Sequence, residues 1–414
     1  MVNPFSVHNS VQTGNVTMAP GAQLNAGNVT VNPGHPSVHL ALRATLRRDE
    51  FDPGVEDERI ALGSVSEIHL NALLERNAFA ILDFAAGMHL YRTRQYARAA
   101  DHFLRAAETI HPDNYPGGID LAIGSAYLHL TLHDEAIRAF DRALSTTPES
   151  EPALRAALLN ARGYARSSQG YAEVALDDLD ASLRITEEIL GVRDPVYALR
   201  LSNKAVVLTK TGEMKRAEAL FKQALSTLEA AHGRRHPRVA IVLNNVGVMW
   251  YERGQFDKAS SLLTEALSID ESELGSSHPN VAVRLYNLAS LSERTGDPKM
   301  ALERQLGAYR IDRMALGTHP YTARDAERLA DLQGVSEALV KLDEAADIYG
   351  ALRADRGRAR ALRRKGDVQC GAGAYRDAIK EYSAAREIWV SLHSDREVFD
   401  ADDRIDRARS GNCK

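Results

Sequence analysis

Apolar and polar residues alternate with a helical period from Ser64 almost to the end of the chain, and short breaks interrupt this pattern at regular intervals. Most breaks carry a glycine. An aromatic or large apolar residue follows two positions later and an alanine five positions later, as in Gly254-Gln-Phe256-Asp-Lys-Ala259. Apolar residues that recur every three or four positions line one face of a helix, and glycine lets the chain reverse because it accepts positive φ angles. The pattern therefore predicts pairs of amphipathic helices joined by tight turns.

Eight such breaks predict eight helix pairs. The turn positions are Arg94, Thr131, Gly170, Gly212, Gly254, Gly296, Gln333 and Gly373. The large residue after each turn fills the wedge between two helices, and the alanine permits the axial distance of about 8–10 Å that is typical of packed helices. The predicted fold class is all-α, an α-solenoid of about eight helix pairs.

The central part of the array repeats with a constant period. Pro195, Pro237 and Pro279 lie 42 residues apart. Two further sets keep the same spacing, namely Asn203, Asn245 and Asn287, and Gly212, Gly254 and Gly296. A fixed period of this length is the signature of a stacked repeat array, in which each unit packs only against its neighbours.

The residues within one period resemble the tetratricopeptide repeat. Leu243-Asn-Asn-Val246-Gly247-Val-Met-Trp250 matches the core of that family's first helix, and Ala266-Leu267-Ser-Ile269 matches its second helix. The resemblance covers residues 64–393. It implies a right-handed superhelix of tetratricopeptide-like pairs, whose concave groove binds peptides or partner helices.

Residues 195–320 are similar to the kinesin light chain type of this repeat, in which the second helix is longer and ends in a Gly-x-x-His-Pro loop. The similarity rests on the loops Leu274-Gly-Ser-Ser-His278-Pro279 and Leu316-Gly-Thr-His319-Pro320 and on the Leu-x-Asn-Leu-Ala sequence at 285–289. His236 recurs with these two histidines at the repeat period. All three are expected to cap helix ends and not to gather in a metal site.

Residues 1–35 contain no Lys, Arg, Asp or Glu and repeat the sequence Gly-Asn-Val-Thr. Two interpretations stay open: a disordered tail, or short β-arches that pair with copies of themselves, because uncharged alternating strands suit cross-β stacking. The second interpretation resembles the amyloid-like signalling motifs of some bacterial immune proteins. Residues 36–63 predict a short helix and an acidic linker, residues 64–393 the repeat array, and residues 394–414 a polar capping helix and tail.

The composition narrows the classes of partner. The net charge of −5 and the pI of about 6.3 give no general attraction to nucleic acid or to anionic membranes. No apolar run reaches the roughly 18 residues of a membrane span, and the N-terminus lacks the features of a signal peptide. Cys370 and Cys413 are too few for a disulfide framework, so a reducing cytoplasm is the expected location. No residue pattern indicates a catalytic, cofactor or metal site, and no enzyme activity is expected.

Three asparagines recur on the predicted first helices, nine residues before the turn glycine: Asn203, Asn245 and Asn287. In tetratricopeptide repeats this position faces the groove, and Asn244 precedes it in the second period. An amide offers two donors and one acceptor oxygen to the backbone of an extended peptide. In the alternative interpretation, some of these asparagines bond the backbones of neighbouring helices and have a structural role.

Four arginines form the predicted basic end of the groove. Arg360 and Arg364 share one face of the first helix in the last predicted pair. Arg324 and Arg328 lie on the first helix of the pair before it. The resemblance implies that arginines at such positions can hold a partner's C-terminal carboxylate, which a guanidinium matches bidentately. The alternative is a solvated helix face.

These residues predict a non-enzymatic scaffold that binds a peptide or a segment of a partner protein in the groove. The alternative function is a peptide- or signal-responsive regulator, similar to the tetratricopeptide receptors for peptide pheromones in Gram-positive bacteria. Residues 1–35 would then serve self-association or recruitment. No nucleic-acid or membrane partner is expected.

Overall fold

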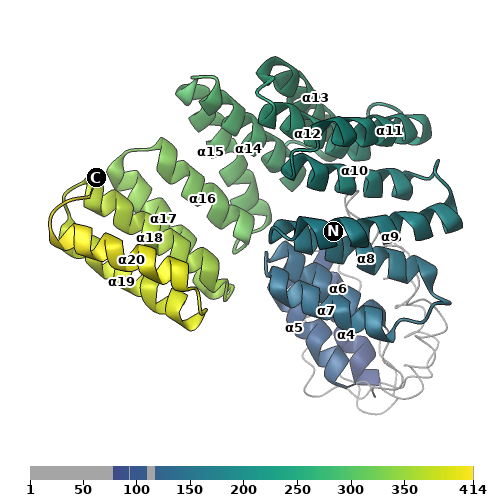
Figure 1. Ribbon diagram of the computed structural model, residues 1–414, viewed down its shortest axis with the longest axis horizontal. Helices are drawn as coiled ribbons and strands as arrows, with labels where there is room; N and C mark the ends of the chain where they lie inside the picture. Colours follow the sequence, from purple (N-terminus) through teal and green to yellow (C-terminus); the bar gives the residue numbers. More distant parts are fainter. Residues whose placement is uncertain (1–77, 93, 110–116, 414) are drawn as a thin grey trace, which may run out of the picture. The chain divides into compact units, whose positions relative to one another are not determined.

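The computed structural model describes residues 78–92, 94–109 and 117–413. This part of the chain forms 17 α-helices and no strands (Figure 1). The predictions for residues 1–35 and 36–63 lie outside it. The helices are α4 (Ala78–Arg92), α5 (Tyr96–Glu108), α6 (Gly117–His129), α7 (His133–Thr146), α8 (Pro152–Ser168), α9 (Ala172–Leu190), α10 (Pro195–Lys210), α11 (Met214–His232), α12 (Pro237–Glu252), α13 (Phe256–Leu274), α14 (Pro279–Arg294), α15 (Pro298–Ala315), α16 (Pro320–Leu332), α17 (Val335–Ala351), α18 (Asp355–Gly371), α19 (Tyr375–Ser391) and α20 (Asp395–Arg409).

The chain divides into two compact units, Met1–Thr227 and Leu228–Lys414, and each is considered by itself. In the first unit, α4 to α10 pack in chain order, each helix against the next, and α8 also contacts α6 and α10. In the second unit, α12 to α20 pack in the same way, and α12 also contacts α14. Successive helix pairs that pack on their chain neighbours form an α-solenoid, so the predicted fold class is confirmed.

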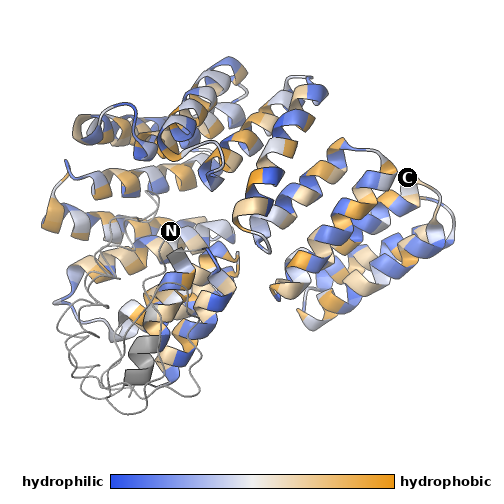
Figure 2. Ribbon diagram, turned by 180° about the vertical axis from the view of Figure 1, so that it is seen from behind, coloured by the Kyte–Doolittle hydropathy of each residue, from blue (hydrophilic) through white to orange (hydrophobic). Residues whose placement is uncertain are grey.

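Within a pair, a glycine of the first helix makes room for a large side chain of the second. A Cβ added to Gly124 of α6 would lie 2.3 Å from the ring of Phe140 in α7, and one added to Gly366 of α18 would lie 2.6 Å from the ring of Tyr382 in α19. Both rings are buried. Apolar and polar residues alternate along the helices (Figure 2), as is typical of helices that bury one side against their neighbours.

Seven of the eight predicted turn positions have a positive φ angle. The five glycines have φ values between 70° and 90°. Arg94 and Thr131 occupy the same place with φ values of 61° and 56°, although their Cβ atoms disfavour this conformation. Gln333 is the exception: the chain turns one residue later at Gly334, which precedes α17 with φ −71°.

The recurring histidines cap helices, as their spacing predicts. Nδ1 of His236, His278 and His319 each accepts a hydrogen bond of 3.1 Å from the backbone N–H two residues later, at the starts of α12, α14 and α16. Asp194 caps α10 in the same way, with a hydrogen bond of 2.7 Å from Val196. A proline follows each cap at the first helical position, where its missing N–H is no loss.

Two facing positions recur where the second helix of one pair meets the first helix of the next, and their chemistry changes along the chain. The pairs of positions are Thr186 with Arg200, Leu228 with Val242, Asp270 with Arg284, and Asp312 with Asp325, and all eight residues are buried. In the first pair of positions, Arg200 donates a hydrogen bond to the hydroxyl of Thr186. In the second pair, both residues are apolar. The third is an ion pair of 2.9 Å, and in the fourth both positions carry a buried carboxyl group.

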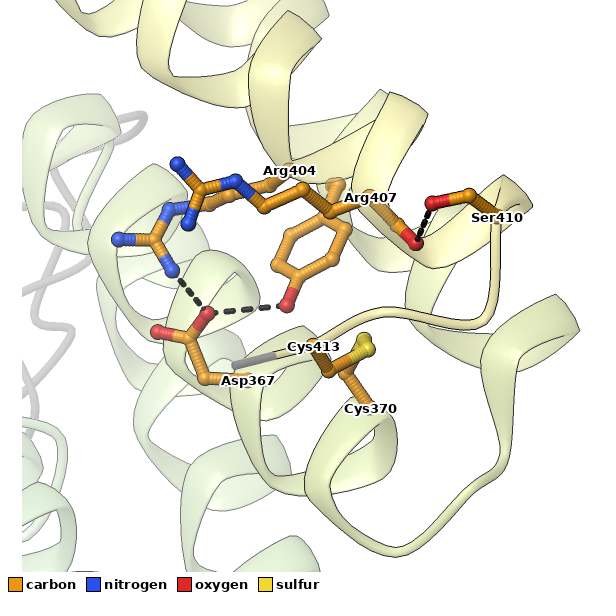
Figure 3. Close-up of a disulfide and its surroundings, with 7 residues drawn as sticks. Asp367, Cys370, Arg404, Arg407, Ser410 and Cys413 are labelled. Atoms are coloured by element: carbon orange, nitrogen blue, oxygen red, sulfur yellow. Dashed lines mark hydrogen bonds and ion pairs between the residues drawn. A yellow bond between two sulfur atoms is a disulfide. The ribbon is translucent and has the colours of Figure 1, made fainter.

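The last helix, α20, packs on α19 and returns the chain towards α18. Ala408 and Ile405 of α20 join a buried cluster with Cys370 and Tyr382, and Cys413 packs at its edge. Cys370 and Cys413 form a disulfide, with their Cα atoms 5.7 Å apart (Figure 3). Sequence analysis did not anticipate this bond, because the cysteines lie 43 residues apart and only the packing of α20 brings them together.

Candidate interaction face

The predicted asparagines lie on first helices and hydrogen-bond one another across neighbouring pairs. In the first unit, Nδ2 of Asn203 in α10 donates to Oδ1 of Asn160 in α8 over 3.1 Å. Asn160 is 43 residues before Asn203, one residue off the repeat period, and sequence analysis missed it.

In the second unit, Nδ2 of Asn287 in α14 donates to Oδ1 of Asn244 in α12 over 2.7 Å. Asn244 in turn donates to Asn245 over 3.4 Å. Asn244 is buried, whereas Asn245 and Asn287 are half-buried. Asn287 and Asn244 therefore join neighbouring first helices through their side-chain amides, and not through the helix backbones that the alternative interpretation names. A single hydrogen bond uses only part of the capacity of an amide, so Asn287 can also serve a ligand.

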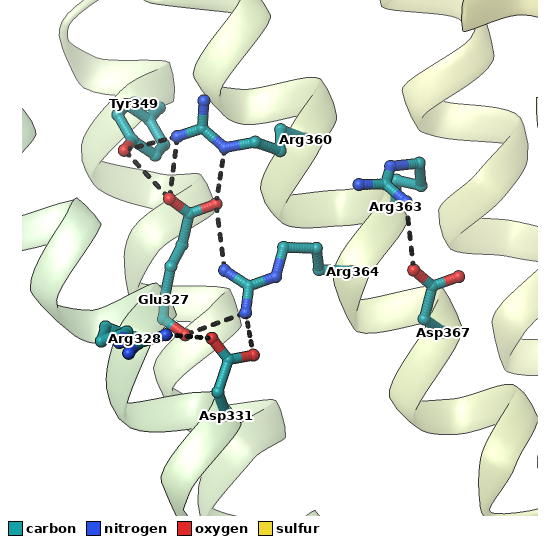
Figure 4. A network of polar contacts seen from close by, with 8 residues as sticks. All are labelled: Glu327, Arg328, Asp331, Tyr349, Arg360, Arg363, Arg364 and Asp367. Carbon is teal, nitrogen blue, oxygen red and sulfur yellow. Dashed lines mark hydrogen bonds and ion pairs between the residues drawn. The ribbon is translucent and has the colours of Figure 1, made fainter. Parts of the chain in front are cut away.

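Arg360 of α18 binds Glu327 of α16 with two parallel hydrogen bonds of 3.1 and 2.8 Å (Figure 4). Its guanidinium also donates to the hydroxyl of Tyr349 over 2.9 Å. Burial alone would lower the pKa of Arg360, but hydrogen bonding and charge from Glu327 outweigh it, and the pKa is raised. Burial and the Glu327 carboxylate also raise the pKa of Tyr349. Arg360 is thus held charged and the phenol neutral.

Arg364 and Arg328 continue the same row of contacts. Arg364 forms an ion pair with Asp331 and donates to the backbone carbonyl of Glu327 over 3.2 Å. Arg328 of α16 pairs with Glu293 of α14 and lies 3.9 Å from Asp331. Figure 4 shows Arg328, Asp331 and Arg364 gathered beside Glu327.

Arg324 lies between two aromatic rings. Its guanidinium is centred 3.9 Å from the ring of Tyr286 in α14 and 4.9 Å from that of Tyr321, and it donates to Asp325 over 3.0 Å. Burial by itself would lower the pKa of Arg324, but the Asp325 carboxylate and the tyrosines raise it. A cation placed over aromatic faces is stabilised by the ring quadrupole.

The predicted residues of the second unit therefore lie on one row of neighbouring first helices, which we call the first-helix face. It comprises Asn244 and Asn245 on α12, Asn287 on α14, Arg324 and Arg328 on α16, and Arg360 and Arg364 on α18. Its four arginines contact four acidic residues, Glu293, Asp325, Glu327 and Asp331. An acidic ligand would have to compete with these carboxylates. Asn203 belongs to the first unit and is not part of this face.

Two family models match the sequence, and both describe the tetratricopeptide repeat. One matches residues 197–272 and 238–314, and the other matches residues 84–151. These ranges contain the turns at Arg94, Thr131, Gly212, Gly254 and Gly296. Both stretches of the chain consist of tetratricopeptide repeats. No enzyme family is indicated by these matches, and no curated protein matches the sequence.

Several solved structures resemble this chain. A Rap protein complexed with competence and sporulation factor is 13% identical, with a TM-score of 0.49, and the match covers 80% of this chain and 97% of that one. BtubC (BKLC) from P. vanneervenii is 22% identical, with a TM-score of 0.40 and coverage of 55% and 92%. The apo form of RapI is 17% identical, with a TM-score of 0.43 and coverage of 70% and 99%. Such low identities and TM-scores carry no function over to this repeat protein.

No helix in 78–92, 94–109 or 117–413 is both long and apolar enough to cross a membrane. Within the same ranges, no three His, Cys, Asp or Glu side chains are placed to hold a metal ion.

Proposed function

We propose that this protein is a non-catalytic scaffold whose first-helix face binds an extended segment of a partner protein. One observation carries the proposal: polar side chains connect α12, α14, α16 and α18 in an uninterrupted row of contacts. Asn287 bonds Asn244, Arg324 stacks on Tyr286, and Arg360 bonds Glu327. A segment that crosses these helices meets a polar side chain at every step.

The two ends of the face offer different chemistry. At the α12–α14 end, the half-buried amides of Asn245 and Asn287 suit the N–H and C=O groups of a peptide backbone. At the α16–α18 end, the side chain of Arg360 is 47% exposed although it is paired with Glu327. An acidic group of the ligand can therefore share this guanidinium. We propose that the segment lies with its acidic group on the α18 side.

A random-peptide display selection on the full chain tests this function. The wild-type protein is expected to select a consensus sequence with an acidic residue or a free C-terminus. The double variant Asn245→Ala/Asn287→Ala should bind the selected peptides with an affinity that is lower by about tenfold or more. The reason is that each lost hydrogen bond to a ligand backbone is worth about 1 kcal/mol. Ser260→Ala/Ser261→Ala on the exposed side of α13 is the matched control.

Unchanged affinity in the asparagine double variant, with helical content intact, would remove the first-helix face as the binding site. The same peptides also distinguish a static scaffold from a signal-responsive regulator. A regulator would change its radius of gyration in small-angle scattering when the peptide is added, and a static scaffold would keep it.

A further inference from the structure

The disulfide at the C-terminus connects two parts of the second unit that are distant in the sequence. Cys370 lies in the last turn of α18 and is 5% exposed. Cys413 follows α20 and is half-buried. Their Cα separation of 5.7 Å is ordinary for a disulfide. The bond closes a loop that contains all of α19 and α20, so it ties the last helix back onto the array.

Helix α20 has few apolar contacts of its own. Ten of its 15 residues are charged, and its Phe399 is 77% exposed. Its buried residues are Ala401, Ile405 and Ala408, only one of which is large. An isolated helix of this length is marginal in water, and its stability comes from the apolar face that it buries. This face is small.

Ion pairs add little to the attachment of α20. Arg386 of α19 binds Asp402 of α20 through hydrogen bonds of 2.6 and 3.2 Å, but both side chains are more than a third exposed. Arg404 of α20 pairs with Asp367 of α18, which also accepts a hydrogen bond of 2.9 Å from Tyr382 (Figure 3). An ion pair as exposed as Arg386–Asp402 is worth little in water. The crosslink therefore adds a covalent restraint to an attachment that otherwise rests on a small apolar face and on the contacts of Arg404.

We propose that Cys370 and Cys413 form a redox-reversible crosslink that controls whether α20 covers the last helix pair. The half-buried sulfur of Cys413 is the one that a thiol can reach, whereas Cys370 is enclosed by Tyr382 and Ile405. Opening the crosslink frees α20 to detach and uncovers the apolar cluster of Cys370, Ala378 and Tyr382.

The chemistry is an exchange with a small-molecule or protein disulfide. In the closing direction, the Cys413 thiolate attacks one sulfur of that disulfide, a mixed disulfide forms, and one thiol leaves. The Cys370 thiolate then attacks the Cys413 sulfur and releases the second thiol. The two protons of the cysteine thiols end on the two released thiols, so atoms and electrons balance. Opening is the reverse, with two thiols as the reductant.

The test uses the full chain equilibrated in glutathione redox buffers that range from cytosolic to secretory composition. Free cysteines are counted by alkylation and mass spectrometry, and hydrogen exchange of α20 is followed in each buffer. We expect the count to change from two to none within this range. Reduction should speed exchange in α20 by up to about 1,000-fold, the chain-entropy limit for a loop of this size. Exchange in α16 and α17 should stay unchanged.

Cys413→Ser supplies the matched control, because it replaces one atom in the tail. Its α20 should exchange like that of the reduced wild type in every buffer. Three results would overturn the proposal: two free thiols in the most oxidising buffer, a disulfide that no glutathione buffer reduces, or an exchange rate in α20 that does not respond to the redox state.

Discussion

Replacing Arg284 by valine should destabilise the second unit, because it leaves the carboxylate of Asp270 buried without its guanidinium. The two side chains are 5% and 0% exposed, and Nε of Arg284 lies 2.9 Å from Oδ2 of Asp270. Removing one partner of a buried ion pair costs about 3–5 kcal/mol. Arg284→Val is expected to lower the free energy of unfolding by this amount.

The chain itself supplies the matched double variant. One period earlier, Leu228 and Val242 occupy the equivalent positions, and both are fully buried. Asp270→Leu/Arg284→Val copies this apolar pair. A buried ion pair that is replaced by well-packed apolar residues changes stability by between zero and a gain of about 1–4 kcal/mol. We therefore expect the double variant to be at least as stable as the wild type and the single variant to be much less stable.

Urea unfolding followed by circular dichroism measures these differences. Hydrogen exchange of α13 and α14 checks that the loss is local to this joint, since repeat arrays can open a few helices at a time. The reasoning would be refuted if the double variant were as unstable as Arg284→Val, because the cost would then come from lost shape and not from an unpaired charge. A cost below about 1 kcal/mol for Arg284→Val would refute it as well.

Within α18, Gly366→Ala should lower the free energy of unfolding by about 1–3 kcal/mol, because the added Cβ would meet the ring of Tyr382. A Cβ added at Gly371 meets nothing within 4 Å, so Gly371→Ala should raise the free energy of unfolding by up to about 1 kcal/mol. Equal shifts of the urea midpoint would contradict this. Burial raises the pKa of Asp325 above its unfolded value of about 3.9. The wild type is therefore most stable, as far as Asp325 is concerned, below that pH, and this stability is lost as the pH rises through the folded-state pKa. Asp325→Asn should gain stability relative to the wild type as the pH rises above about 4, and parallel pH profiles in urea unfolding would argue against the raised pKa. Thr131→Gly should stabilise the first unit by about 0.5–1 kcal/mol because the wild-type φ of 56° strains a β-branched residue, and a lower melting temperature would exclude this strain.

The sequence alone was enough to predict the helix pairs, most turns and the caps. These features depend on residues a few positions apart, so a local pattern contains the required information. A glycine or a strained residue at the turn, a histidine before proline, and the spacing of the large residue and alanine each act within one helix pair. The turn after α16 was displaced by one residue because Gly334, and not Gln333, is the residue that directly precedes α17.

The candidate site depended on partners that no local pattern shows. The sequence placed the asparagines and arginines on first helices, but Asn203, Asn287, Arg360 and Arg364 bond partners that lie 33 to 43 residues away on neighbouring helices. Only the stacking of pairs decided that Asn287 bonds Asn244 and that Arg360 bonds Glu327. The predicted basic end of the groove is accordingly paired with carboxylates.

The period and the turn chemistry determined the architecture of this protein without reference to tertiary contacts, because each repeat packs only on its neighbours. Tertiary structure decided which polar groups are paired, since pairing is a property of two helices that the chain brings together. The disulfide shows this most clearly. Neither Cys370 nor Cys413 has a distinctive sequence context, and the packing of α20 on α19 is the physical reason that they meet.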